Sequence, residues 1–155
     1  MTPGQFEFRR EWTTPAPPER VHDVLADVQS YPDWWRQVRA VARIDDDTAH
    51  VLCRSDLPYT LDLVLHAVRR EPALLEVAIS GDLEGWSRAE LAPGSAGSTR
   101  VTYTQAVVVG HRGLALASTL LRPVLRWNHE RMMTGLEQGL ARVSGGSGPG
   151  PGRAR

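Results

Sequence analysis

The chain opens on an alternation of apolar and polar residues. Every second position gives one face, which is largely apolar: Phe6, Phe8, Arg10 and Trp12. This period predicts a half-buried β-strand, and the proline-rich run 13–18 ends it because proline cannot continue a hydrogen-bonded ladder. Two short helices are predicted next, the first from Pro18 to about Asp27 and the second from Ser30 to Arg36.

From Val38 to Val109 the hydrophobic period is two, which predicts further strands. The expected strands cover residues 38–44, 50–55, 59–70, 73–80, 84–91 and 99–109. In the first of them, Val38, Ala40, Ala42 and Ile44 share one face. One face of the central strands is predicted to be buried under the last helix: Leu61, Leu63, Leu65, Leu75, Val77 and Ile79. Asp62 and His66 lie on the other face. Short polar turns between successive strands imply an antiparallel meander.

The last apolar pattern has a helical period, and it runs from about Leu114 to Val143. Pro123 either kinks this helix or begins its main part. A seven-stranded sheet with one apolar face needs a cover, and a single long helix is available. A curved sheet that grips one helix tends to leave a cavity between them.

Composition is typical of an ordinary globular protein, with 155 residues of which 41% are hydrophobic and 23% charged. We predict one domain over residues 1–143, followed by a disordered Gly- and Pro-rich tail over 144–155. Eighteen basic residues balance eighteen acidic ones, so we expect no nucleic-acid partner. Every basic residue is an arginine, which excludes Schiff-base chemistry and a P-loop lysine.

Sequence motifs give no sign of a cofactor, a metal or a membrane segment. The histidines have no metal-binding spacing, Cys53 stands alone, and neither a nucleophile elbow nor a dinucleotide fingerprint occurs. No apolar run reaches the ~20 residues of a membrane span. The amino terminus has no basic stretch followed by an apolar one, so we expect no signal peptide and a cytoplasmic location.

Three stretches resemble a known superfamily. The run TPAPPERV (14–21) resembles its passage from the first strand into the first helix. The run LADVQSYPDWW (25–35) resembles its commonest signature, an aromatic-Pro-acidic-Trp motif that opens a short helix. Tyr103-Thr104-Gln105, Asn128 and Arg131-Met132 are similar to positions in the aromatase/cyclases of aromatic polyketide synthesis.

The chain therefore resembles the SRPBCC or START-like superfamily, and within it the polyketide cyclase/dehydrase and lipid-transport type of family. The resemblance implies the Bet v 1-like helix-grip fold, which is of the α+β class. In this fold a curved, seven-stranded antiparallel sheet wraps around a long C-terminal helix, with two short helices between the first and second strands.

The cyclases resemble one another in an arginine that reaches the pocket from the strand after the central hairpin. This chain has the run LPYTLD (57–62) there, and Arg54 is the nearest substitute. With Arg54, the candidate catalytic residues are Tyr103 and His129. Such groups would assist proton transfers or stabilise enolates.

Polar residues flank the predicted interior face of the last helix and of the last strand. Asn128 and His129 lie on either side of the apolar stripe, and Tyr103 and Gln105 share a face with valines. Each either binds a ligand or finds a partner within the core, because an unpaired buried polar group is costly. The candidate ligand-binding residues are Trp35, Tyr59, Tyr103, Gln105, Asn128, His129 and Met132.

Two further details of packing are expected. Of Trp34 and Trp35, one closes the end of the sheet and the other lies near the cavity mouth, with the assignment open. Gly135 and Gly139 lie one helical turn apart, which predicts close packing against a strand or a ligand.

Three functions fit these patterns. The first is a binding module that takes up a small hydrophobic or aromatic molecule, lipid-like or polyketide-like, in the cavity. The second is a polyketide cyclase or aromatase that guides a poly-β-ketone chain. The third is a structural module with a filled core that forms a homodimer through the outward-facing Trp86 and the sheet edge.

Overall fold

The computed structural model describes residues 5–54, 60–109 and 112–145, the side chains of 112–125 excepted. The strands are β1 (Gln5–Thr14), β2 (Val38–Arg43), β3 (Thr48–Cys53), β4 (Leu61–Glu71), β5 (Leu74–Gly81), β6 (Leu83–Pro93) and β7 (Thr99–Val109). The helices are α1 (Pro18–Ala26), α2 (Tyr31–Trp34) and α3 (Arg112–Gly145), with short 3-10 turns η1 (Val28–Ser30) and η2 (Ser95–Gly97). This is the predicted order of elements, and the α+β prediction is confirmed.

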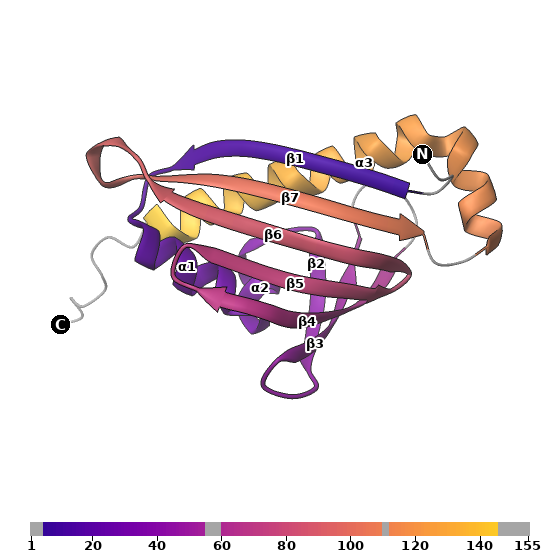
Figure 1. Cartoon of the computed structure of the whole chain (residues 1–155), viewed down its shortest axis with the longest axis horizontal. Helices are drawn as coiled ribbons and strands as arrows, with labels where there is room; N and C mark the ends of the chain where they lie inside the picture. Colours follow the sequence, from indigo (N-terminus) through magenta and orange to yellow (C-terminus); the bar gives the residue numbers. More distant parts are fainter. Residues whose placement is uncertain (1–4, 55–59, 110–111, 146–155) are drawn as a thin grey trace.

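All seven strands form one antiparallel sheet in the order β1-β7-β6-β5-β4-β3-β2. The first and second strands therefore lie at opposite edges, and the segment that joins them must cross from one edge to the other. That segment consists of α1, η1 and α2, which lie at the end of the sheet where α3 finishes (Figure 1). These short helices close one end of the space between the sheet and α3.

The central strands place the predicted side chains on the inner face. Leu61, Leu63, Leu65, Leu75, Val77 and Ile79 all line an internal cavity, whereas Asp62 and His66 are exposed on the outer face. The expected register is therefore correct. Their contact with α3 is not as expected, because α3 packs mainly on β1, β7, α1 and α2 and leaves a space above β3–β5.

Strand β2 departs from the simple alternation. A bulge between Val38 and Ala40 shifts its register against β3. Beyond the bulge, Val41 packs into the core with Val38, while Ala40, Ala42 and Ile44 are exposed. The prediction that Val38 shares a face with those three residues is wrong, because the extra residue in a bulge turns the following side chains to the opposite face.

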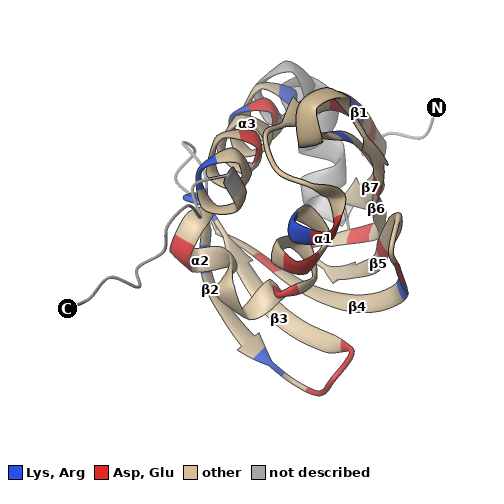
Figure 2. Ribbon diagram, turned by 90° about the vertical axis from the view of Figure 1, so that its left-hand side faces the viewer, with Lys and Arg blue, Asp and Glu red and all other residues tan. Residues whose placement is uncertain are grey.

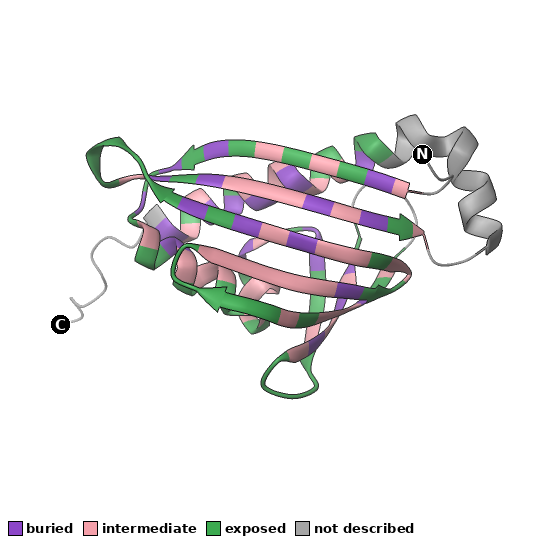
Figure 3. Cartoon of the chain, viewed as in Figure 1, coloured by how far each residue is buried: buried purple, intermediate pink, exposed green. Residues whose placement is uncertain are grey.

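The interior is divided into a packed part and a hollow part. Near the end where α1 and α2 lie, one cluster of buried side chains fills the space: Trp12, Ala16, Val21, Trp34, Leu91, Val101, Met133, Leu136 and Leu140. A second cluster forms the wall of the hollow part: Phe6, Val38, Ala49, Val51, Cys53, Leu63, Ile79 and Val107. Buried positions on α3 recur on the side that faces the sheet (Figure 3).

Helix α3 extends beyond its predicted limits at both ends. It begins at Arg112 and runs through Pro123, so that proline does not begin the helix. At its end Ser144 is buried, and its hydroxyl donates to the carbonyl of Leu140 at 2.5 Å, which satisfies the side chain within the helix. The helix thus includes two residues that the sequence analysis assigned to the tail, and residues 146–155 lie outside the described part.

Two glycines of α3, Gly135 and Gly139, bring the helix against α2. A Cβ atom on Gly139 would overlap the carbonyl oxygen of Trp34, and one on Gly135 would overlap the side-chain oxygen of Gln37. The glycines therefore pack against the end of α2 and the residues that follow it, not against a strand or a ligand as predicted. The carbonyl of Trp34 also accepts a hydrogen bond of 3.1 Å from Arg142, which fastens the same contact.

Replacement of Gly139 by alanine tests this contact. In a helix, alanine is favoured over glycine by about 1 kcal/mol, so an unconstrained site would be stabilised. At Gly139 we expect a net loss of about 1–3 kcal/mol, because the obstacle is rigid backbone. Gly135→Ala is the matched control, since its obstacle is the end of a flexible side chain and its cost should be smaller. Chemical denaturation measures both, and an unfolding free energy raised by Gly139→Ala would contradict the account.

Candidate functional site

A cavity of about 760 Å³ lies between the sheet and α3. Its size falls within the range of sites for small organic ligands. Side chains from α2, α3 and the inner face of the sheet line it, and most of these side chains are apolar. The hollow part of the interior is therefore large enough to hold a molecule of several rings or a long alkyl chain.

One wall of the cavity is apolar. Strands β3, β4 and β5 contribute Ala49, Val51, Leu63, Leu65, Val77 and Ile79. Successive side chains of a strand point to opposite faces of the sheet, so every second residue of each strand contributes a side chain to this wall. This wall offers contact and no hydrogen bond to a bound molecule.

The opposite wall carries a short chain of hydrogen bonds on β6 and β7. The hydroxyl of Tyr103 donates to Oε1 of Gln105 at 2.6 Å, and the hydroxyl of Ser87 is hydrogen-bonded to Tyr103 in turn. Ser87 lies directly across from Gln105 in the β6–β7 register. Both Tyr103 and Gln105 line the cavity, as predicted for ligand-binding residues, and they also pair with each other.

Asn128 of α3 lines the same cavity and is 6% exposed. Its Oδ1 atom is buried without a hydrogen-bond partner, and the amide nitrogen has no partner among the described residues either. A buried amide with no partner loses its hydration without replacement, which costs about 1–3 kcal/mol. Asn128 therefore does not stabilise the empty protein, and its place on the cavity wall calls for another explanation.

His129 follows on α3 and stacks on Phe8 of β1, with ring centroids 3.5 Å apart and planes inclined by 14°. Its Nδ1 atom is buried without a partner. Burial lowers the pKa of His129 to about 3, and Arg126 and Arg10 nearby contribute to the shift. At neutral pH the ring is therefore uncharged.

Two further titratable groups of the cavity, Tyr103 and Cys53, are also neutral. Burial raises the pKa of Tyr103 to about 12, although the Ser87 hydroxyl offsets part of the effect. Burial likewise raises the pKa of the Cys53 thiol to about 12. The phenol and the thiol remain protonated at neutral pH, and the thiol lacks the nucleophilic thiolate form.

Trp35 is the one of the two adjacent tryptophans that faces the cavity. Its ring lines the cavity and its Nε1 donates to the carbonyl of Met132 at 3.0 Å, while Trp34 is buried in the packed part. Met132 lines the cavity too. The structure thus brings together six of the seven candidate ligand-binding residues, and the seventh, Tyr59, lies outside the described residues.

Arg54 does not belong to this group. It is exposed at the end of β3, where the inward position is taken by Cys53, and alternation turns the next side chain outward. Its backbone nitrogen donates to the Gln37 carbonyl at 2.8 Å. The prediction of Arg54 as a pocket arginine is therefore wrong. Trp86 faces outward as expected, with the Arg88 guanidinium 4.9 Å from its ring centroid.

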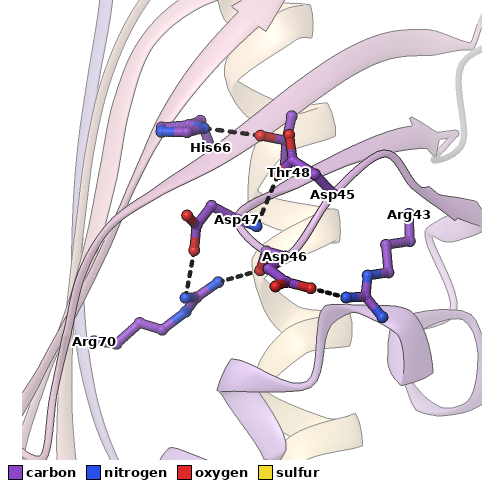
Figure 4. A network of polar contacts seen from close by, with 7 residues as sticks. All are labelled: Arg43, Asp45, Asp46, Asp47, Thr48, His66 and Arg70. Atoms are coloured by element: carbon purple, nitrogen blue, oxygen red, sulfur yellow. Dashed lines mark hydrogen bonds and ion pairs between the residues drawn. The ribbon is translucent and has the colours of Figure 1, made fainter.

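The cavity is bordered by charged residues at the β2–β3 turn, which lies at the end of the sheet away from α3 (Figure 2). Arg70 of β4 donates to the carboxylate of Asp47 at 2.6 Å and to the carbonyl of Asp46 at 2.7 Å, as Figure 4 shows. Arg43 pairs with the Asp46 carboxylate in the same network. These contacts hold the β2–β3 turn against β4. The rim of the cavity is therefore charged, whereas its interior is mainly apolar.

Sequence reasoning missed several residues of the site. Ser87 and Cys53 both line the cavity, and the alternation of β6 and β3 places them on the inner face. Arg10 is not part of the cavity lining, but it reaches from β1 across to α3 and pairs with Glu137 at 2.8 Å. The alternation of the strands predicts that Ser87 and Cys53 face inward. Nothing in the sequence predicts that Arg10 pairs with a residue 127 positions away.

The described part of the chain contains neither a candidate metal site nor a candidate membrane span. Three or more His, Cys, Asp or Glu side chains never gather there in a way that could hold a metal ion. No described helix is long and apolar enough to cross a membrane.

The buried His129 predicts a pH dependence of stability. Its folded pKa lies below its unfolded value of about 6.5, so the unfolded chain binds the extra proton between about pH 6.5 and 3. Stability is therefore complete above pH 6.5 and falls as the pH decreases. Between pH 8 and pH 5, the wild type should lose about 2 kcal/mol more than His129→Phe, which keeps the ring stacked on Phe8. Urea denaturation at both pH values checks this, and equal losses would show that His129 titrates normally.

Comparison with solved structures shows the same fold in several proteins. The Zhui aromatase/cyclase from Streptomyces sp. R1128 superposes with a TM-score of 0.76 at 15% identity, over 94% of this chain and 99% of that one. A START superfamily protein from Mycobacterium smegmatis gives a TM-score of 0.70 at 14% identity, over 90% and 97% of the two chains. A protein from Thermus thermophilus, TTHA0849, gives 0.71 at 21% identity, over 90% and 99%.

At these identities the likeness shows the fold, which is the helix-grip fold of the START and Bet v 1-like superfamily. A search of curated proteins by sequence found no match. A family model does match, over residues 5–144, and its description is "Polyketide cyclase / dehydrase and lipid transport". Because the match covers nearly the whole domain, the chain belongs to the polyketide cyclase/dehydrase and lipid transport family.

Proposed function

We propose that this protein binds a small hydrophobic or aromatic molecule in the cavity between the sheet and α3. The observation that carries the proposal is Asn128, a buried amide without a partner on the wall of a cavity of about 760 Å³. A ligand hydroxyl would donate to the Oδ1 atom, and a ligand carbonyl oxygen would accept from the amide nitrogen. The family description fits this proposal, since it names lipid transport beside polyketide chemistry.

The energetics favour an occupied cavity. Empty apolar space destabilises a protein, by about 24 cal/mol per Å³ in cavity-creating mutants. The same apolar walls would contribute about 25 cal/mol for each Å² of ligand and wall surface removed from water. A ligand therefore recovers stability that the empty fold lacks. The size of the cavity also argues against a purely structural module with a filled core.

A polyketide cyclase or aromatase is the second candidate. It is favoured by the two protonated groups of the polar wall, Ser87 and Tyr103, which could hydrogen-bond to an enolate oxygen. Against it, efficient general acid–base catalysis at neutral pH requires a pKa near 7, and the pKa values of His129 and Tyr103 lie far on either side. Binding and orientation of a reactive chain would remain as the contribution of the cavity.

A blocked cavity gives the direct test. We expect at least one of emodin, oleic acid and cholesterol to raise the melting temperature of the wild type, because a ligand of the folded state stabilises it. Val77→Trp places a large ring in the cavity and should lower the affinity for that ligand by about tenfold or more. Differential scanning fluorimetry and fluorescence titration measure both effects.

Ala78→Trp is the matched control for this experiment. Ala78 is the next residue of β5 and lies on the outer face, opposite Trp86 in the register. We expect the Ala78→Trp variant to bind the ligand with the affinity of the wild type. If none of the three compounds stabilises the wild type, or if both tryptophan variants bind equally, the proposal fails.

Replacement of Asn128 tests whether its amide binds the ligand. Asn128→Leu removes a buried amide without a partner and adds apolar volume beside the cavity, so the empty protein should gain about 1–3 kcal/mol of unfolding free energy. The same variant should bind the ligand more weakly, since the hydrogen bond to the amide is lost. Denaturation and titration of one preparation give both numbers. A variant that is destabilised without a change in affinity would show that Asn128 serves packing alone.

A further inference from the structure

The hydrogen bonds of the polar wall run in one direction. Tyr103 donates its only proton to Oε1 of Gln105, at 2.6 Å. The Ser87 hydroxyl is hydrogen-bonded to the Tyr103 oxygen from the other side. The chain Ser87–Tyr103–Gln105 therefore ends on a carboxamide whose oxygen is already occupied.

The free end of this chain is a donor. With Oε1 bound, the side-chain nitrogen of Gln105 is the atom left to interact, and it has no partner among the described residues. Gln105 is 7% exposed and lines the cavity, and its nitrogen is not among the enclosed atoms that lack a partner, so a molecule in the cavity can reach it. An N–H group on the cavity wall is a donor that a ligand acceptor can satisfy.

We propose that Gln105 is the residue that selects the ligand, and that it binds a carbonyl oxygen of an uncharged, largely apolar molecule. The inference rests on the proposed function of the cavity and adds the chemical class of the ligand. The inner face of β3–β5 opposite it is mainly apolar, so the ligand carries its oxygen on one edge and hydrocarbon on the other.

Tyr103 fixes this preference by holding the amide in one orientation. A carboxamide can turn by 180° and exchange its donor and acceptor ends. In the wild type the turned amide would keep its bond to Tyr103 only if the phenol hydrogen also turned, toward Ser87, so that the phenol oxygen accepted from the amide nitrogen. Without the phenol, the amide is free to turn and present its oxygen to a ligand hydroxyl instead.

Two tricyclic compounds of nearly the same shape test the proposal. In 9-fluorenone a carbonyl group replaces the CH₂ group of fluorene. We expect the wild type to bind 9-fluorenone about 3- to 10-fold more tightly, the effect of one neutral hydrogen bond. Gln105→Leu should bind both compounds with the same affinity, near that of the wild type for fluorene. Quenching of intrinsic tryptophan fluorescence gives the affinities.

A second variant and a second observable separate a selective from a structural role. Tyr103→Phe should bind 9-fluorenol, which offers a hydroxyl donor, as tightly as 9-fluorenone, whereas the wild type should prefer the ketone. In ¹H–¹⁵N spectra of the wild type, the side-chain amide proton of Gln105 should move downfield with 9-fluorenone and much less with fluorene. A merely structural Gln105 would show neither effect.

The outcomes distinguish this inference from the proposed function. If fluorene and 9-fluorenone bind the wild type equally well, the selection by Gln105 is wrong and the binding cavity stands. A preference for the ketone that survives in Gln105→Leu overturns the inference in the same way. If neither compound binds, the cavity does not take aromatic molecules, and both proposals fail for that class of ligand.

Discussion

The close approach of α3 to the end of α2 and to the residues after it is the contact on which the rest of the structure depends. It is possible only because Gly135 and Gly139 have no side chain where Gln37 and the Trp34 backbone pass. With the helix held there, its C-terminal half joins Trp12, Val21 and Leu91 in a packed core at one end of the sheet. The part of α3 that carries Asn128 to Met132 then borders the cavity, and its side chains leave the space above β3–β5 unfilled. The cavity is therefore a consequence of where the helix is fastened.

The chemistry of the cavity follows from its burial. Removal from water disfavours charge on the groups of the interior, so His129 loses its proton while Tyr103 and Cys53 keep theirs. What remains is a set of neutral hydrogen-bonding groups on one wall and hydrocarbon on the other. Such a surface orients an uncharged molecule and has no group poised to move protons at neutral pH. The charged residues lie instead at the rim, where Arg70 ties down the β2–β3 turn.

Much of this arrangement could be predicted from the sequence, because alternation is a local signal. The leucines of β4 face the cavity as their period of two requires, and Tyr103 and Gln105 follow the same rule on β7. Long-range contacts carry no such signal. Nothing local says that the α3 glycines meet Trp34, that Phe8 stacks on His129, or that the β2 bulge turns Ala40 outward. The prediction for Arg54 was wrong for a related reason. It came from a resemblance to the cyclases, whereas the alternation of β3 turns this side chain away from the cavity.

The central claim is that the space between the sheet and α3 holds a small, largely apolar molecule. The most direct measurement is a crystal structure of the protein grown with emodin. The account predicts ring density between Val77 and Asn128, with an oxygen of the ligand within hydrogen-bonding distance of the Asn128 or Gln105 amide. An interior that is filled by the protein's own side chains, with emodin absent or bound only on the outer surface, would contradict it.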